Sequence, residues 1–156
     1  MKPKHESILE SLRAWLCLCP ALEGGVFGVD RVETRPASCT LRPKGETVLR
    51  RYLDGGRQNE LRFEICVCGF YGADTAHLLH MRRRLDALAA WLLRERRRPP
   101  VLSDGRRALF AEPLEEAVFS KNGENSALWT LPCRLVYYQP YTKTLDCERM
   151  CPFETD

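Results

Sequence analysis

The feature that most constrains the fold is an alternating apolar pattern directly after a glycine-rich turn. Residues 61–70 read LRFEICVCGF, and apolar side chains occupy every second position: Leu61, Phe63, Ile65 and Val67. A period of two places such a set on the core face of a sheet. The turn at residues 54–56, Asp-Gly-Gly, accommodates the positive φ angles of a tight hairpin. The pattern therefore predicts a β-hairpin made of residues 46–53 and 61–70.

Two helices are expected, one near the start of the chain and one in its middle. A Ser-x-x-Glu capping box beginning at Ser7 opens the first helix, and Pro20 ends it. The second helix is expected to begin at Asp74 or Thr75 and to end near Arg96, before two consecutive prolines. Its apolar stripe has helical spacing: Leu78, Met81, Leu85, Leu88, Ala89 and Leu92.

Further strands are expected on both sides of the central helix. Residues 26–33 and 39–41 have short strand patterns. Residues 109–120 and 126–138 are expected to form a second hairpin, because the turn between them contains Asn-Gly at 122–123.

Hairpins and helices without βαβ alternation indicate the α+β class. The predicted architecture is a mainly antiparallel sheet with an N-terminal helix and one long central helix packed on one face. The length of 156 residues corresponds to a single domain. We expect this domain to span residues 1–139 and a C-terminal tail to span residues 140–156. No apolar run reaches the length that a membrane span requires.

Basic charge is concentrated in one segment, which we call the basic flank. The net charge of the chain is only +3, yet nine arginines and three acidic residues lie between Arg82 and Arg107. This segment therefore carries +6, and the rest of the chain carries −3. A basic flank on a mildly acidic domain indicates a directed protein interface. The expected contact residues are Arg82, Arg83, Arg94, Arg96, Arg97 and Arg98.

The cysteines and histidines lack the spacing of a known catalytic or metal site. None of the eight cysteines forms a C-x2-C pair, and His77 and His80 lack the remainder of a zinc motif. We therefore expect no enzyme activity, no cofactor and no metal, and interpret most of the cysteines as small apolar core residues. A weaker alternative is a metal- or thiol-dependent enzyme that uses Cys66, Cys68 and His77.

Several motifs occur in an order that resembles a known family. They are Arg-Tyr-x-Asp-Gly at 51–55, Phe-Tyr-Gly-Ala-Asp at 70–74, Leu-x-Asp-Gly at 102–105 and Cys-Arg-Leu-x-Tyr-Tyr-Gln at 133–139. Over about residues 8–139 the chain resembles the tail terminator-type, or minor capsid, proteins. These are encoded in the tail-assembly region of siphophages and of prophages of Gram-positive bacteria.

The resemblance implies a structural phage tail-assembly protein that is not an enzyme. Such proteins form a ring, typically of six subunits, which caps the tail tube and provides the head-joining surface. The implied partners are further copies of the chain, the tail tube protein and head–tail connector proteins. The implied location is the bacterial host cytoplasm during assembly and then the virion tail. The chain departs from this resemblance in its number of cysteines and in the tail that contains Cys147 and Cys151.

The basic flank fits this role, because each subunit of a closed ring needs two different complementary patches. We expect the flank to contact an acidic neighbour, either the next subunit or the tail tube. The alternative from another class is a nucleic-acid-binding α+β domain that uses residues 82–107 to bind phosphates.

Overall fold

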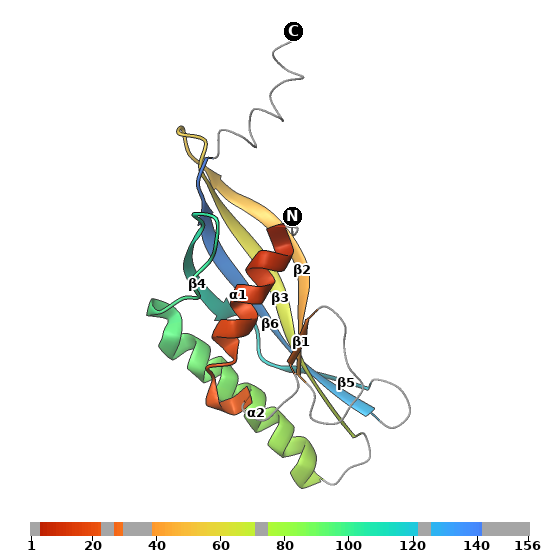
Figure 1. The fold of residues 1–156 in the computed structure, drawn as a ribbon. Helices are drawn as coiled ribbons and strands as arrows, with labels where there is room; N and C mark the ends of the chain where they lie inside the picture. Colours follow the sequence, from red (N-terminus) through yellow and green to blue (C-terminus); the bar gives the residue numbers. More distant parts are fainter. Residues whose placement is uncertain (1–3, 23–26, 30–38, 71–74, 122–125, 142–156) are drawn as a thin grey trace.

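A six-stranded sheet is covered on one face by two α-helices (Figure 1). The computed structural model describes residues 4–22, 27–29, 39–70, 75–121 and 126–141. The elements in chain order are α1 (Lys4–Leu16), η1 (Pro20–Leu22), β1 (Phe27–Val29), β2 (Cys39–Arg51), β3 (Arg57–Phe70), α2 (Thr75–Arg94), η2 (Glu95–Arg97), β4 (Arg107–Pro113), β5 (Val118–Lys121) and β6 (Ser126–Gln139). The expected α+β class is confirmed.

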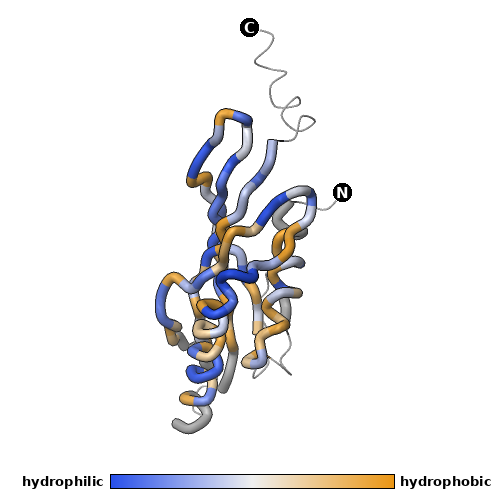
Figure 2. The backbone as a smooth tube through the Cα atoms, turned by 90° about the vertical axis from the view of Figure 1, so that its left-hand side faces the viewer, coloured by the Kyte–Doolittle hydropathy of each residue, from blue (hydrophilic) through white to orange (hydrophobic). Residues whose placement is uncertain are grey.

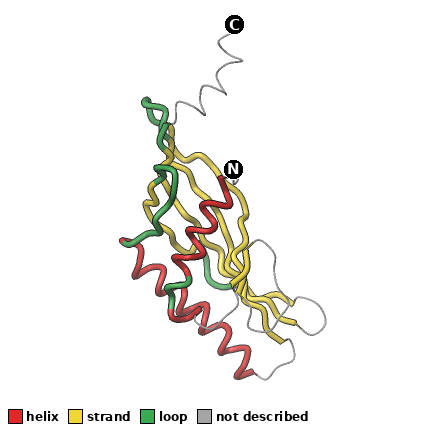
Figure 3. The backbone as a smooth tube through the Cα atoms, in the orientation of Figure 1, coloured by secondary structure: helices red, strands yellow, loops and turns green. Residues whose placement is uncertain are grey.

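The strand order is β1-β2-β3-β6-β4, and β5 also pairs with β6. All pairs are antiparallel except β1 with β2. Because β3 pairs with β6 along its whole length, β4 and β5 lie one after the other on the opposite edge of β6. Both helices lie on the same side of the strands (Figure 3).

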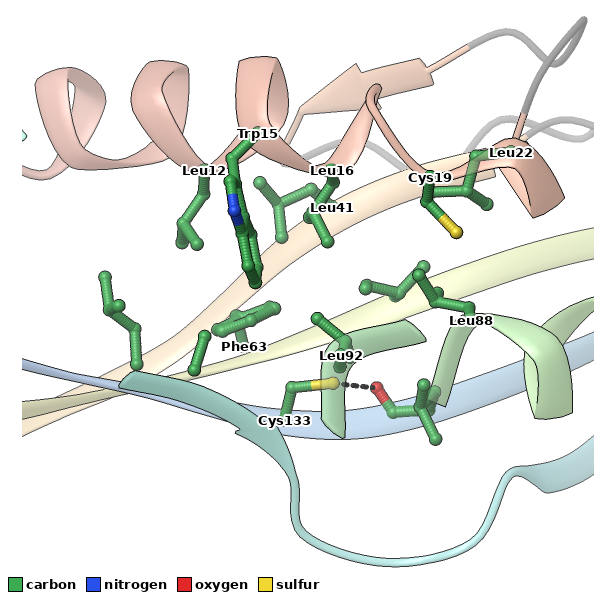
Figure 4. Packing of buried hydrophobic residues seen from close by; sticks show 14 of the residues in the cluster. Leu12, Trp15, Leu16, Cys19, Leu22, Leu41, Phe63, Leu88, Leu92 and Cys133 are labelled. Atoms are coloured by element: carbon green, nitrogen blue, oxygen red, sulfur yellow. Dashed lines mark hydrogen bonds between the residues drawn. The ribbon is translucent and has the colours of Figure 1, made fainter. Parts of the chain in front are cut away.

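The hydrophobic core fills the space between the sheet and the two helices. The four alternating residues from 61 to 67 are all buried, as the pattern predicts. In the neighbouring strand Leu135, Cys133 and Leu131 lie opposite the first three of them. Figure 4 shows α1 and α2 directing apolar side chains toward these strands, among them Leu12, Leu16, Leu88 and Leu92. The indole rings of Trp15 and Trp91 join the two helices, with centroids 4.9 Å apart.

The opposite face of the sheet carries a network of ion pairs. Arg134 of β6 lies 2.9 Å from Glu60 of β3 and 2.7 Å from Glu112 of β4. Arg62 lies 2.8 Å from the same Glu60 carboxylate, whose side chain is only 6% exposed. These contacts cross three adjacent strands, so they link β4 to the middle of the sheet.

Two expected strand boundaries are wrong. Residues 39–41 are not a separate strand, because β2 runs from Cys39 to Arg51 with register shifts near Pro43 and after Val48. The expected strand 109–120 is divided, because β4 ends at Pro113 and β5 begins at Val118. The backbone N–H of Leu114 still donates to the carbonyl of Pro132, at 2.8 Å.

The helices also differ from the expected bounds. The first begins at Lys4, before the predicted cap at Ser7, and ends at Leu16. The second ends at Arg94 and continues as the 3-10 turn of η2. Of the expected strand 26–33, residues 27–29 form β1 and the others lie outside the described residues. The Asn-Gly turn at 122–123 lies outside them too.

The division into residues 1–139 and 140–156 stays a prediction, since residues 142–156 lie outside the described part. Within the described helices, no segment is both long and apolar enough to cross a membrane.

Candidate functional site

The basic flank begins on the solvent side of α2. Five exposed residues follow one another at spacings of three or four along this surface: Arg83, Ala87, Ala90, Arg94 and Arg97. Residues at these spacings share one face of a helix. The stripe therefore has an arginine at one end, two at the other, and small side chains between them.

Three of the six expected contact residues are available to a partner. Arg83, Arg94 and Arg97 are exposed and make no hydrogen bond or ion pair with any described residue. An arginine in this state can form a bidentate contact with a carboxylate or a phosphate without breaking an existing bond.

The other three expected contact residues have partners within the chain. Arg82 lies 3.8 Å from Asp86, and its guanidinium lies 5.9 Å from the Trp129 ring centroid. Arg96 lies 3.7 Å from Glu112 and stacks over Phe110. Arg98 lies 3.5 Å from the Glu95 carboxylate.

Two further arginines of the flank hold the fold together. Arg84 donates to the carbonyl of Ala21 at 2.7 Å, which ties α2 to η1. The side chain of Arg106 is 3% exposed and lies 3.0 Å from Asp104, and it also donates to the carbonyl of Ser103. The net charge of +6 therefore overstates the charge that a partner can reach.

The chain also has an exposed hairpin with apolar residues at and near its end (Figure 2), which sequence patterning did not identify as a site. We call residues 48–57 the hairpin tip, where β2 turns into β3. Leu53 is fully exposed at the turn, and Arg50 and Arg51 are exposed beside it. Figure 2 shows this hairpin as mainly hydrophilic with hydrophobic segments at and near its end. The turn itself is well formed, because Asp54 accepts a hydrogen bond from the N–H of Gly56 at 2.9 Å.

Two grooves open on the surface of the described part of the chain. The first, of about 770 Å³, lies between α1 and the segment after η2, with Trp15, Trp91 and Val101 in its lining. The second, of about 410 Å³, lies between α2 and the break that separates β4 from β5. Its lining combines Asp86, Glu115 and Glu116 with apolar residues that include Leu93 and Leu114. We call the second one the acidic groove.

The sequence could not indicate the acidic groove, because its two walls are distant in the chain. Glu115 and Glu116 fell inside a predicted strand, where alternation would have separated their side chains. They instead lie together in the break between β4 and β5. The only signal in the sequence is Pro113, which disfavours a continuous strand.

The four buried thiols of the described part are poorly suited to nucleophilic chemistry. Burial raises the pKa of Cys39 to about 12, and burial also raises the pKa of Cys19, Cys66 and Cys133. These thiols are therefore protonated near neutral pH, whereas the thiolate is the reactive form. Cys66 accepts a long hydrogen bond from the Thr130 hydroxyl, at 3.8 Å.

The alternative site at Cys66, Cys68 and His77 is not assembled by the described residues. Ile65 and Val67 point into the core beneath the helices, so Cys66 between them points to the opposite face. His77 belongs to α2, which packs on the core face of the sheet, opposite to the Cys66 side chain. The side chains of Cys68 and His77 themselves lie outside the described part. Among the described side chains, no group of three His, Cys, Asp or Glu residues is arranged to hold a metal ion.

A buried polar cluster lies near the base of the hairpin. The Tyr137 hydroxyl donates to Glu46 at 2.6 Å and accepts from the Asn59 amide at 3.3 Å. Burial, together with the bond to Glu46, raises the pKa of Tyr137. The tyrosine stays protonated at physiological pH and joins β6 to β2, so its place in the Tyr-Tyr-Gln motif has a structural explanation.

Comparisons with known proteins support the fold. No family model matches the chain, and no curated protein does. Among solved structures, a chain in the virion of a native gene transfer agent particle matches with a TM-score of 0.51 and 21% identity. The match covers 86% of this chain and 94% of that chain. The two chains therefore share a fold over almost their whole length.

Proposed function

We propose that this chain is a structural component of a phage-like particle, and more specifically a tail terminator-type protein. The observation that carries the proposal is the shared fold with a chain of a gene transfer agent virion, which extends over 94% of that chain. The motif order that resembles tail terminators is consistent with it. In this role the chain forms a ring that caps the tail tube and provides the surface on which the head is joined.

The surface of the chain suits assembly. A ring subunit needs two unlike patches, because the interface between neighbours is heterologous. The exposed stripe that contains Arg83, Arg94 and Arg97 can supply one such patch, because none of the three has a partner among the described residues. A basic patch of this kind favours oriented association with an acidic neighbour.

The proposed role is not catalytic, and the protonated state of the buried thiols supports this part of the proposal. The chain would act in the host cytoplasm while particles assemble and then reside in the tail. Its partners would be further copies of itself, the tail tube protein and the head–tail connector proteins.

Deletion of the gene in its source strain, followed by electron microscopy of the particles, tests the proposed function. A terminator stops tube growth, so we expect unjoined heads and tails of irregular, extended length. Complementation with the wild-type gene should restore joined particles of uniform length. Normal particle yield and tail length in the deletion strain would refute the proposal.

The contribution of the basic flank has its own test in the complementation assay. Arg83, Arg94 and Arg97 are each replaced by Glu, and Arg13→Glu on α1 serves as the matched control. Arg13 is also exposed and makes no hydrogen bond or ion pair through its side chain with described residues. We expect the triple variant to fold but to fail in ring formation or tube binding, while the control complements fully. If the triple variant complements, these arginines do not form the expected interface.

Nucleic-acid binding is the competing outcome, because three exposed arginines on one helix face would also suit phosphates. Fluorescence anisotropy with a labelled DNA duplex at increasing salt separates the two. Affinity that falls steeply with salt and is lost in the triple variant would favour the nucleic-acid alternative. Weak binding that the triple variant retains would favour the structural role.

A further inference from the structure

We propose that the hairpin tip of one copy of this chain docks into the acidic groove of a second copy. The inference deepens the proposed ring by assigning two self-association surfaces, and it rests on that function only in assuming that copies associate. It concerns residues other than the exposed arginines of α2.

The first observation is the exposed apolar surface at both places. Leu53 is fully exposed at the end of the hairpin, and Leu49 is nearly half exposed. In the groove Leu93 is 58% exposed and Leu114 is 39% exposed, although both border buried core residues. Removing a leucine side chain from water is favourable, because its surface is apolar. Both surfaces therefore gain from contact with an apolar partner.

The second observation is charge complementarity. The tip carries Arg50, Arg51 and Arg57 against one acidic residue, Asp54, which is engaged in the turn. The groove carries three acidic residues and no basic residue in its lining. Within the described chain, Glu115 and Glu116 make no ion pair, and neither do Arg50 and Arg51. The acidic groove and the basic hairpin tip are thus complementary in charge, and each also exposes leucine side chains.

The third observation is that the hairpin tip and the acidic groove of one chain are too far apart to contact each other. The tip adjoins Gln139, since Arg57 pairs with that residue, whereas the groove includes Leu131 of the same strand. Eight residues of extended strand separate these positions, which is about 26 Å. Figure 1 shows the hairpin projecting at one end of the sheet, away from α2. The hairpin tip can therefore contact an acidic groove only in another copy of the chain.

A contact of this kind joins the hairpin tip of one copy to the acidic groove of another. The resulting dimer keeps one free tip and one free groove. Such heterologous association closes into a ring or continues as a filament. The acidic groove, of about 410 Å³, is open to solvent, so a leucine side chain at the end of a projecting hairpin of another copy can reach it.

The direct test is photo-cross-linking from the tip. A benzophenone amino acid replaces Leu53 in the full chain, and mass spectrometry identifies the cross-linked peptides. We expect cross-links to peptides that contain residues 86–93 or 113–117 of another copy. Cross-links confined to other segments, or no cross-link at the highest soluble concentration, would overturn the inference.

The second test uses two variants, each defective in one surface. Leu53→Asp disables the tip, and the double variant Glu115→Lys, Glu116→Lys disables the groove. Each should self-associate about tenfold more weakly than the wild type, measured by sedimentation velocity. Their mixture retains one intact pair of surfaces and should give a 1:1 dimer that does not grow. Leu18→Asp is the matched control, because Leu18 is exposed and apolar but borders the other groove.

Charge exchange provides the specificity control. Arg50→Glu with Arg51→Glu should weaken association, and mixing this tip variant with the double groove variant should restore it. Association of Leu53→Asp at wild-type strength would also overturn the inference. If that result accompanied irregular tails in the deletion strain, the proposed function would stand and only this interface would be wrong.

Discussion

The guanidinium of Arg96 lies 4.5 Å from the centroid of the Phe110 ring. This contact, with the 3.7 Å approach to Glu112, joins η2 to the edge strand β4. Arg97, the next residue, is exposed and makes no hydrogen bond or ion pair with described residues. Neighbouring arginines in one charge cluster therefore have different roles.

Arg96→Ala should lower the free energy of unfolding by about 1 kcal/mol, because it removes a cation–π contact and a half-exposed ion pair. Arg97→Ala should change stability by much less. Urea denaturation followed by circular dichroism measures both. Equal effects of the two substitutions would contradict the distinct roles described above.

Glu60 should contribute to the acid sensitivity of the fold. Hydrogen bonds from Arg62, and then from Arg134, lower its pKa in the folded state below the ordinary value of 4.5. A group with a lowered folded pKa stabilises the fold above its unfolded pKa, and this contribution is lost as pH falls through the folded pKa. Glu60→Gln should therefore be less stable than the wild type at pH 7 and lose less stability between about pH 5 and pH 3. Glu115→Gln is the control, because Glu115 is exposed and makes no ion pair with described residues. Denaturation curves of the wild type and both variants across this pH range measure the effect.

The described cysteines should differ sharply in reactivity. Cys17 is exposed, whereas Cys19, Cys39, Cys66 and Cys133 are buried and have raised pKa values. Iodoacetamide at neutral pH should label Cys17 first, and the buried four should react only after unfolding. Peptide mapping by mass spectrometry distinguishes the sites. Rapid labelling of Cys66 in the native protein would support the thiol-enzyme alternative.

Trp15 should stabilise the junction between α1 and the segment after η2. Its indole N–H donates to the carbonyl of Arg98 at 2.9 Å, and its ring packs on Trp91. Trp15→Phe should lower the free energy of unfolding by about 1–2 kcal/mol, because that carbonyl loses its donor. Trp129→Phe is a suitable comparison, since the indole nitrogen of Trp129 is buried without a hydrogen-bond partner among the described residues. Thermal unfolding should show a smaller loss for Trp129→Phe.

Much of the fold follows from local patterns. Alternation from Leu61 to Val67 identified the buried face of β3, and the Asp-Gly-Gly turn identified the first hairpin. Two prolines placed the end of the central helix close to its observed position. These features depend on residues close together in the chain, so periodicity and turn chemistry are sufficient to find them.

Local patterns were misleading where a neighbouring strand decides the outcome. Residues 39–41 and 46–53 were expected to lie in separate strands, yet β2 passes through Pro43 and Gly45 between them because β3 supplies partners on both sides. The break between β4 and β5 arises because the neighbouring strand cannot supply regular hydrogen bonds there. Pro113 and Pro132 both lack an N–H at that point of the ladder, so regular pairing stops and only the Leu114 to Pro132 bond remains.

By itself the sequence determined the class of the fold, its main hairpin, its long helix and the existence of one basic segment. Only the tertiary structure decided which arginines of the described part are available to a partner, because Arg96 reaches β4 and Arg84 reaches η1 across distances that no local pattern encodes. Tertiary structure alone also created the acidic groove, whose walls come from separate segments of the chain and meet only when α2 packs beside β6. Burial and the choice of interaction partner depend on contacts between residues that are distant in the chain. Periodicity indicates only which secondary structure a segment favours and which of its faces is apolar.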